Sequence, residues 1–106
     1  MIVRRLNDHG LRHVLGSGGL RVVAFVEYGP PPCRHFKPEY EVVAKMFEGA
    51  IRFYEIDAQE NPTVAKARAI ESVPTTLVFR DCNEIARYEG PYSREFLRER
   101  IGPLIA

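Results

Sequence analysis

The sequence contains no tryptophan, only two cysteines among its 106 residues, and no excess of one charge, since fifteen basic and fourteen acidic residues leave a net charge of +1. It also lacks any apolar run of the roughly 18 residues that a membrane-spanning helix needs. The balanced charge gives no electrostatic case for a nucleic-acid partner or for a membrane-surface partner. We therefore expect a protein that binds neither.

The scarcity of cysteine argues against a framework of structural disulfides. Arg4 and Arg5 lie near the start, as in some export signals, but the segment LNDHGLRHVLG that follows is not an apolar core. We therefore expect a cytoplasmic protein. Cys33 and His35 lie close together without the paired ligand spacing of zinc sites, so we expect no metal and no other cofactor.

Hydrophobic periodicity and turn residues give an order of elements along the chain. Continuous apolar runs predict buried strands, and apolar residues spaced by three and four positions predict amphipathic helices. The order β-α-β-α-β-α-β-β-α predicts one α/β domain over residues 1–106, with a mixed central sheet and helices on both faces. We expect strands at 2–6, 22–26, 51–57, 77–79 and 85–88, and helices capped by Asn7, beginning at Pro32 with a kink at Pro38, spanning 62–69, and capped by Ser93.

Four short segments occur in an order that is typical of one family. The run FVEYGPPPC (25–33) joins a strand to a helix, and ENP (60–62) precedes another helix. SVPTTLVF (72–79) and EGPYSREFL (89–97) lead into the last hairpin and the last helix. In this order and at these separations, the segments resemble the thioredoxin family over nearly the whole chain. The resemblance implies the thioredoxin fold and a cis peptide bond before Pro74.

The segment that matches the family's active site departs from the family's pattern. Where the family has Trp-Cys-Gly-Pro-Cys, this chain has Gly-Pro-Pro-Pro-Cys, so Pro30 takes the place of the first, attacking cysteine. Ala24 stands where the thioredoxin type has a buried aspartate. The family's cycle needs an attacking thiolate and a second thiol that resolves the mixed disulfide. The resemblance therefore implies that dithiol activity is absent or very weak, which leaves open whether the chain is an enzyme.

Two interpretations of Cys33 remain open. If Pro32 is the first helical residue, Cys33 lies in the first turn, where the helix dipole favours a thiolate, and Gly29 in place of an indole leaves the thiol more exposed. Alternatively, Cys33 is a small buried hydrophobe, because free cysteine is among the most buried residue types. We interpret His35 as a solvated helix residue and Asp57 as a surface charge.

Two functions from different classes follow from the resemblance. The first is a thioredoxin-like protein that performs at most single-cysteine thiol exchange. The alternative is a non-catalytic module or chaperone-like adaptor that binds a protein or peptide on the cis-proline surface, as an added strand. Thiol-containing clients are among the expected partners. The candidate residues are Cys33 for catalysis, Gly29, Pro30, Pro31 and Pro32 for the active-site loop, and Val73 and Pro74 for substrate binding.

Cys82 lies at the tip of the predicted hairpin, far from Cys33. An internal disulfide between the two is therefore not expected, since a disulfide needs Cα atoms within about 7 Å of each other. We expect a monomer in which an exposed Cys82 can link two chains under oxidising conditions.

Overall fold

The computed structural model describes residues 2–105, and its strands form one five-stranded sheet in the order β1-β3-β2-β4-β5. Three strands are parallel: β1 (Arg4–Leu6), β3 (Arg52–Asp57) and β2 (Leu20–Val26). The other two, β4 (Thr75–Arg80) and β5 (Asn83–Glu89), form a hairpin whose first strand pairs antiparallel with β2. β2 therefore occupies the centre of the sheet.

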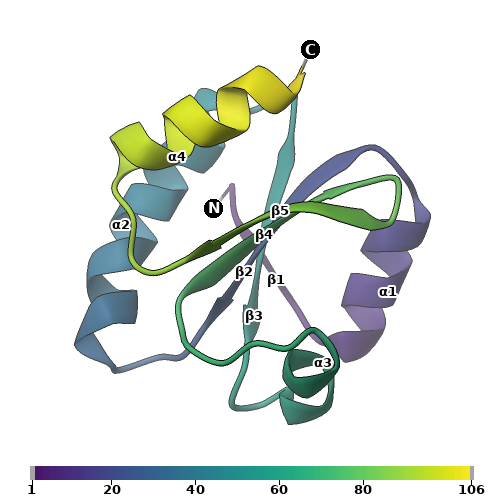
Figure 1. Ribbon diagram of the computed structural model, residues 1–106, viewed down its shortest axis with the longest axis vertical. Coiled ribbons are helices and arrows are strands. Elements are labelled where there is room, and N and C mark those ends of the chain that lie inside the picture. The colour runs from purple at the N-terminus through teal and green to yellow at the C-terminus, as the bar shows by residue number, and fades with distance from the viewer. Residues whose placement is uncertain (1, 106) are drawn as a thin grey trace.

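Helices cover both faces of this sheet. α1 (Asp8–Gly16) and α3 (Pro62–Ala67) lie on one face, and α2 (Pro31–Met46) and α4 (Arg94–Ile101) lie on the other (Figure 1). A short 3₁₀-helix, η1 (Gly102–Ile105), follows α4. The α/β fold class and the predicted order of elements are confirmed. No helix among residues 2–105 is long and apolar enough to cross a membrane.

The hydrophobic core lies in two layers, one on each face of the sheet. The layer under α1 and α3 contains mostly aliphatic side chains together with Phe25, Tyr54 and Phe79. The layer under α2 and α4 also holds aromatic rings, including Phe36, Tyr40 and Phe53, in stacked and edge-on contacts. Cys33 belongs to this second layer.

The predicted helix caps are confirmed, and some boundaries differ. Asn7 Oδ1 accepts a hydrogen bond from the Gly10 amide at 2.8 Å, and Ser93 Oγ accepts one from the Phe96 amide at 3.2 Å. α2 begins at Pro31 instead of Pro32, because two prolines fit the first helical positions, where no donor is needed. α3 ends at Ala67, before Ala69, whose φ of 55° cannot continue a helix.

The hairpin turn is tied to the start of β2. Its two central residues, Asp81 and Cys82, have φ angles of 48° and 76°, as the twist of a two-residue hairpin turn requires. The Asp81 amide donates to the Gly19 carbonyl at 3.1 Å, and the Gly19 amide donates to Asp81 Oδ1 at 2.7 Å. The turn, with Cys82 in it, therefore lies at the Leu20 end of β2.

Candidate functional site

The candidate active-site loop connects the Val26 end of β2 to α2. Gly29, Pro31 and Pro32 are exposed, and Pro30, the N-cap of α2, is half-buried. The Cys33 amide donates to the Pro30 carbonyl at 3.1 Å, which closes a tight turn at the helix entry. Gly29 has a φ of 113°, a conformation that side-chain-bearing residues rarely adopt. In this chain the backbone therefore favours glycine, and an indole there would be strained.

Cys33 is completely buried, with 0% of its surface exposed. Burial is the largest influence on the thiol, and it raises the pKa of Cys33 above the ordinary value. The Glu27 amide, which donates to Cys33 Sγ at 3.4 Å, lowers the pKa by a smaller amount. The expectation that Gly29 leaves this thiol exposed is wrong, because α2 and the core enclose the sulfur, and the buried interpretation fits.

The loop before β4 lies beside the same end of β2. The Val73–Pro74 peptide bond is cis, the geometry that the resemblance implied. Pro74 is buried and Val73 is half-buried, so Val73 provides more of the accessible surface. The Pro74 carbonyl accepts from the Gly90 amide at 2.9 Å. Among residues 2–105, no loop or turn hydrogen bond involves the Val73 backbone.

A groove of about 420 Å³ opens next to Val73. It lies between α3 and the loop that precedes β4, near the end of the sheet where β2 ends at Val26. Apolar side chains line part of it, and charged groups stand beside them. The residues that matter most for its character are the apolar Ala65, Ile70 and Val73 and the charged Glu27, Lys66 and Glu71.

A buried polar cluster supports the loop, and the sequence analysis missed it. Glu55 is only 3% exposed, yet its Oε2 accepts from the Tyr28 hydroxyl at 2.9 Å and lies 3.2 Å from Lys37 Nζ. Burial, followed by the bond to Glu55, raises the pKa of Tyr28 to about 12. Arg5 and Lys37 make cation–π contacts with the Tyr28 ring, with Arg5 Cζ 4.5 Å and Lys37 Nζ 4.3 Å from the ring centroid. An acidic residue within a buried apolar strand was the available signal.

Asp57 and His35, interpreted from the sequence as a surface charge and a solvated helix residue, differ in their burial. Asp57 is not a surface charge: it is 6% exposed, and its Oδ1 accepts from the amides of Gln59 and Glu60 at 2.8 Å and 3.1 Å. It therefore holds the turn after β3. His35 is exposed on α2, as interpreted. Among residues 2–105, no group of three or more potential ligands is placed to hold a metal ion.

Cys82 lies at the opposite end of β2 from Cys33, and both thiols are free. The Cys82 side chain is exposed, although its Sγ donates to the Leu15 carbonyl at 2.8 Å. The length of β2, seven residues at about 3.3 Å each, separates the two ends. The prediction that the two cysteines are far apart agrees with this placement.

The fold, with an N-terminal turn of α2 beside a cis-proline loop, defines a thioredoxin-fold protein. The Thioredoxin family profile matches residues 6–102, and the chain belongs to the thioredoxin family. It is therefore a thioredoxin-like member of a redox family, although the loop that aligns with the family's active-site motif has a single cysteine, Cys33.

Individual relatives agree with this placement. The chain is 35% identical over 83 residues to chloroplastic thioredoxin M4 of Arabidopsis thaliana, an alignment that covers 76% of this chain and 43% of that protein. It is 31% identical over 83 residues to a thioredoxin of Staphylococcus aureus (strain Mu50), with coverage of 78% and 80%. The crystal structure of thioredoxin from Trypanosoma brucei brucei superposes with a TM-score of 0.89 at 20% identity, covering 97% of this chain and 90% of that chain, which shows the shared fold.

Proposed function

We propose that this chain is a non-catalytic binding module that receives an extended protein or peptide segment in the groove beside Val73. The observation that carries the proposal is the contrast between a sealed thiol and an open groove. Cys33 has no exposed surface, whereas the groove of about 420 Å³ lies open a short distance along the same end of the sheet. Binding there requires no sulfur chemistry.

The backbone next to the groove supports recognition of an extended segment. The Val73 amide and carbonyl have no partner among the loop and turn hydrogen bonds of residues 2–105. A segment that lies along this loop in an extended conformation satisfies both groups, as in other cases of strand addition. The flanking Thr75 hydroxyl donates to the Ser72 carbonyl at 2.7 Å, which holds the loop in place. A preorganised loop reduces the entropy that binding must offset.

The side chains of the groove indicate the kind of segment that fits. Ala65 and Ile70 offer an apolar floor, and Glu27 and Glu71 outnumber the single basic group, Lys66. Alternate side chains of an extended strand point in opposite directions, so every second residue meets the groove. We therefore infer a ligand with apolar residues at alternate positions and at least one basic residue.

A binding measurement tests the proposal directly. The probe is a fluorescently labelled, acetylated and amidated peptide in which valine and lysine alternate, and it contains no cysteine. We expect saturable binding to the folded chain and chemical-shift changes at the amides of Val73 and Ile70. Binding confined to another surface, or no saturation, contradicts the proposal.

A matched pair of variants separates groove binding from charge attraction. Ser72→Arg places a long side chain at an exposed position that lines the groove, and Thr63→Arg adds the same charge at an exposed position of α3 outside its lining. Steric filling of the groove by the first variant predicts a loss of about tenfold or more in affinity, because contacts near the centre dominate binding. Equal losses in both variants contradict the groove as the site.

Single-cysteine exchange at Cys33 is the second candidate function. Burial has the largest effect on the pKa of Cys33 and raises it. The hydrogen bond from the Glu27 amide to the sulfur and the nearby Lys37 charge both act in the opposite direction and lower this pKa. In such an exchange, Cys33 thiolate attacks glutathione disulfide, a mixed disulfide forms, and one glutathione thiolate leaves. A mass increase of one glutathione on Cys33 in the folded chain supports this candidate.

We also propose that the protein is a monomer and that it resides in the reducing cytoplasm. Both cysteines are free, as a reducing compartment favours. Cys82 is exposed and is therefore the thiol that links two chains if the protein is oxidised. We expect sedimentation of a monomer under reducing conditions and a dimer after oxidation that Cys82→Ser abolishes.

A further inference from the structure

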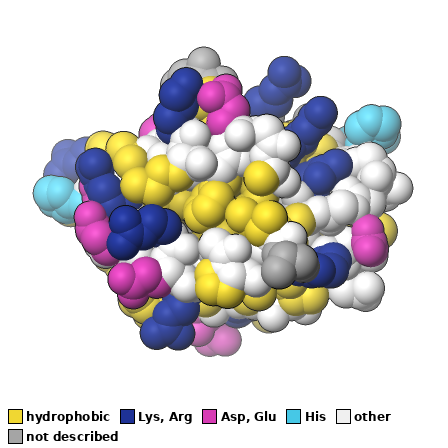
Figure 2. Space-filling view, turned by 90° about the horizontal axis from the view of Figure 1, so that it is seen from above, with side chains coloured by type: hydrophobic (Ala, Val, Ile, Leu, Met, Phe, Trp, Pro, Cys, Tyr) yellow, Lys and Arg dark blue, Asp and Glu magenta, His cyan; other side chains and the backbone are white. Residues whose placement is uncertain are grey.

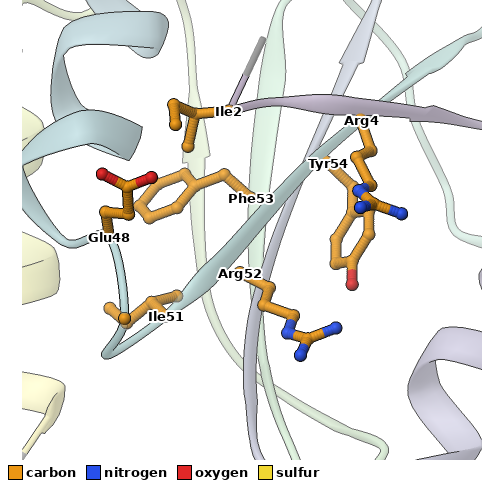
Figure 3. Close-up of a pocket in the computed structure, with 8 residues that line it drawn as sticks. Ile2, Arg4, Glu48, Ile51, Arg52, Phe53 and Tyr54 are labelled. Carbon is orange, nitrogen blue, oxygen red and sulfur yellow. The ribbon is translucent and has the colours of Figure 1, made fainter.

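A second cavity, of about 290 Å³, opens at the opposite end of the sheet, on the edge of β3. β1 begins at Arg4, which is in register with Tyr54, so the first two residues of β3, Arg52 and Phe53, have no strand partner on the β1 side. Arg4, Arg52 and Tyr54 extend on one side of β3, and the Tyr54 hydroxyl lies between the two guanidinium groups in this view (Figure 3).

Within the described residues 2–105, neither guanidinium group at this cavity pairs with a carboxylate. Neither Arg4 nor Arg52 takes part in an ion pair or a side-chain hydrogen bond among residues 2–105, although both are exposed. Glu48, the acidic residue in the lining, lies on the other side of β3 and pairs with Lys45 at 3.1 Å (Figure 3). Figure 2 views the end of the molecule where β3 begins, and several Lys and Arg side chains lie at the upper right of that view.

A third arginine increases the unbalanced charge. Arg21 of β2 is in register with Arg52 of β3, and residues in register on neighbouring strands project from the same face. Like charges directly opposite each other in a sheet are destabilising. Arg21 Nε is buried without a hydrogen-bond partner, while its Nη1 donates to the Leu20 carbonyl at 3.0 Å. Among residues 2–105, no carboxylate pairs with any of these three arginines, and such uncompensated costs are expected at functional sites.

We propose that Arg4, Arg52 and the Tyr54 hydroxyl form a binding site for a phosphate group. Guanidinium groups bind phosphate oxygens through paired, charge-assisted hydrogen bonds, and a phenol hydroxyl donates a further one. Phosphate has three strong acceptor oxygens and a carboxylate has two, so a site with three donor groups suits phosphate better. Arg4 and Arg52 are exposed and Tyr54 is 6% exposed, so either inorganic phosphate or the phosphate of a monoester reaches the site from the arginine side. It is independent of the groove beside Val73.

The test titrates the full chain with inorganic phosphate and, separately, with phenyl phosphate, at constant ionic strength and pH. Amide and arginine side-chain signals are followed by nuclear magnetic resonance. We expect saturable changes at Arg4, Arg52 and Tyr54 in the millimolar range. Tighter binding of phenyl phosphate identifies a monoester as the ligand, and equal binding identifies the free anion. Linear, non-saturating changes, or changes centred elsewhere, overturn the proposal.

Variants assign the binding to these side chains. Arg4→Gln and Arg52→Gln each remove one charged donor and should weaken phosphate binding about tenfold or more, and Tyr54→Phe should weaken it about fivefold. Arg34→Gln, which removes an exposed arginine of α2, should change it by less than about twofold. Equal weakening by Arg34→Gln and Arg52→Gln shows a general charge effect and overturns the site.

A conservative variant guards against a purely structural effect. Arg52→Lys keeps the charge but loses the planar pair of donors, and it should bind phosphate more weakly than the parent chain and more tightly than Arg52→Gln. Because the Arg52 side chain is exposed, the amide spectrum of each variant should retain the dispersion of a folded protein. Identical affinities for all three chains contradict a role for this guanidinium.

Discussion

One cysteine lies near each end of β2, and the two thiols differ in their exposure to solvent. At the Val26 end, Cys33 is fully buried within the first turns of α2, and its pKa is raised. At the Leu20 end, Cys82 lies exposed in a hairpin turn, and its thiol donates a hydrogen bond to the Leu15 carbonyl. The cysteine at the family's active-site position is therefore the less accessible one. Position in a motif does not make a thiol reactive, because reactivity depends on exposure and on the charge around the sulfur.

The largest expected effect is the difference between the two thiols in labelling rate. With a neutral, water-soluble maleimide on the folded chain, Cys82 should react at least about a thousandfold faster than Cys33, because a buried thiol reacts only after opening, against a stability of roughly 5 kcal/mol or more. Mass spectrometry of digested samples over time measures both rates in one experiment.

The control for this experiment is the same labelling in denaturant, where the two rates should converge. Rapid labelling of Cys33 in the folded chain, with an apparent pKa below the free-cysteine value of about 8.5, contradicts the buried interpretation and favours single-cysteine exchange.

The second prediction concerns restoration of a cysteine pair by Pro30→Cys. The Cys33 amide donates to the Pro30 carbonyl at 3.1 Å, so the two positions are one turn apart and suit a disulfide. The introduced thiolate attacks a substrate disulfide, and Cys33 then displaces the second substrate thiol and completes a two-electron reduction. With dithiothreitol as the electron source, we expect measurable insulin reduction above the reagent background, against none for the parent chain.

The activity of Pro30→Cys should stay below that of a thioredoxin with its usual motif. Ala24 offers no side-chain group to accept the Cys33 proton, and Pro31 stiffens the turn between the two sulfurs. Loss of Pro30 should lower the free energy of unfolding by up to about 1 kcal/mol, because the unfolded chain gains freedom. Vigorous insulin reduction by the parent chain would show that one cysteine suffices.

The third prediction compares serine at the two cysteine positions. Cys33→Ser places a hydroxyl in the apolar layer under α2, where the Glu27 amide offers only a donor, which should lower the free energy of unfolding by about 1–3 kcal/mol. Cys82→Ser is exposed and should change it by less than about 0.5 kcal/mol. Denaturant unfolding of both variants measures the difference, and equal losses would contradict the contrast between the two ends.

Local sequence patterns predicted the elements of this fold but not the packing around the site. Asn7 and Ser93 were identifiable as caps because a cap depends on groups within one helical turn. The burial of Cys33 and Asp57 depends on distant segments that close over them, which no local pattern records. Glu55 was missed for the same reason: its partners, Tyr28 and Lys37, lie in a loop and a helix far earlier in the chain.

The smallest expected effect concerns Tyr28, which holds the Val26 end of β2 through its bond to Glu55. Its folded-state pKa of about 12 lies above the ordinary value of 10.0, so the protonated form is the one that folding favours. The resulting stability is complete below about pH 10 and is lost as the pH rises toward about 12, because the unfolded chain loses its proton first. Tyr28 is 39% exposed, so solvent screens this contribution and keeps it small.

A comparison with Tyr28→Phe isolates that contribution. The pKa values of Tyr40 and Tyr88 are also raised, by burial above all, but both residues remain in the variant and cancel in the comparison. Between about pH 10 and 12, the parent chain should lose more free energy of unfolding than the variant does, as measured by denaturant titration at each pH. Parallel pH profiles would show that the Tyr28–Glu55 bond does not hold this end of β2, and the loop that carries Cys33 would then owe its position to the prolines and the core alone.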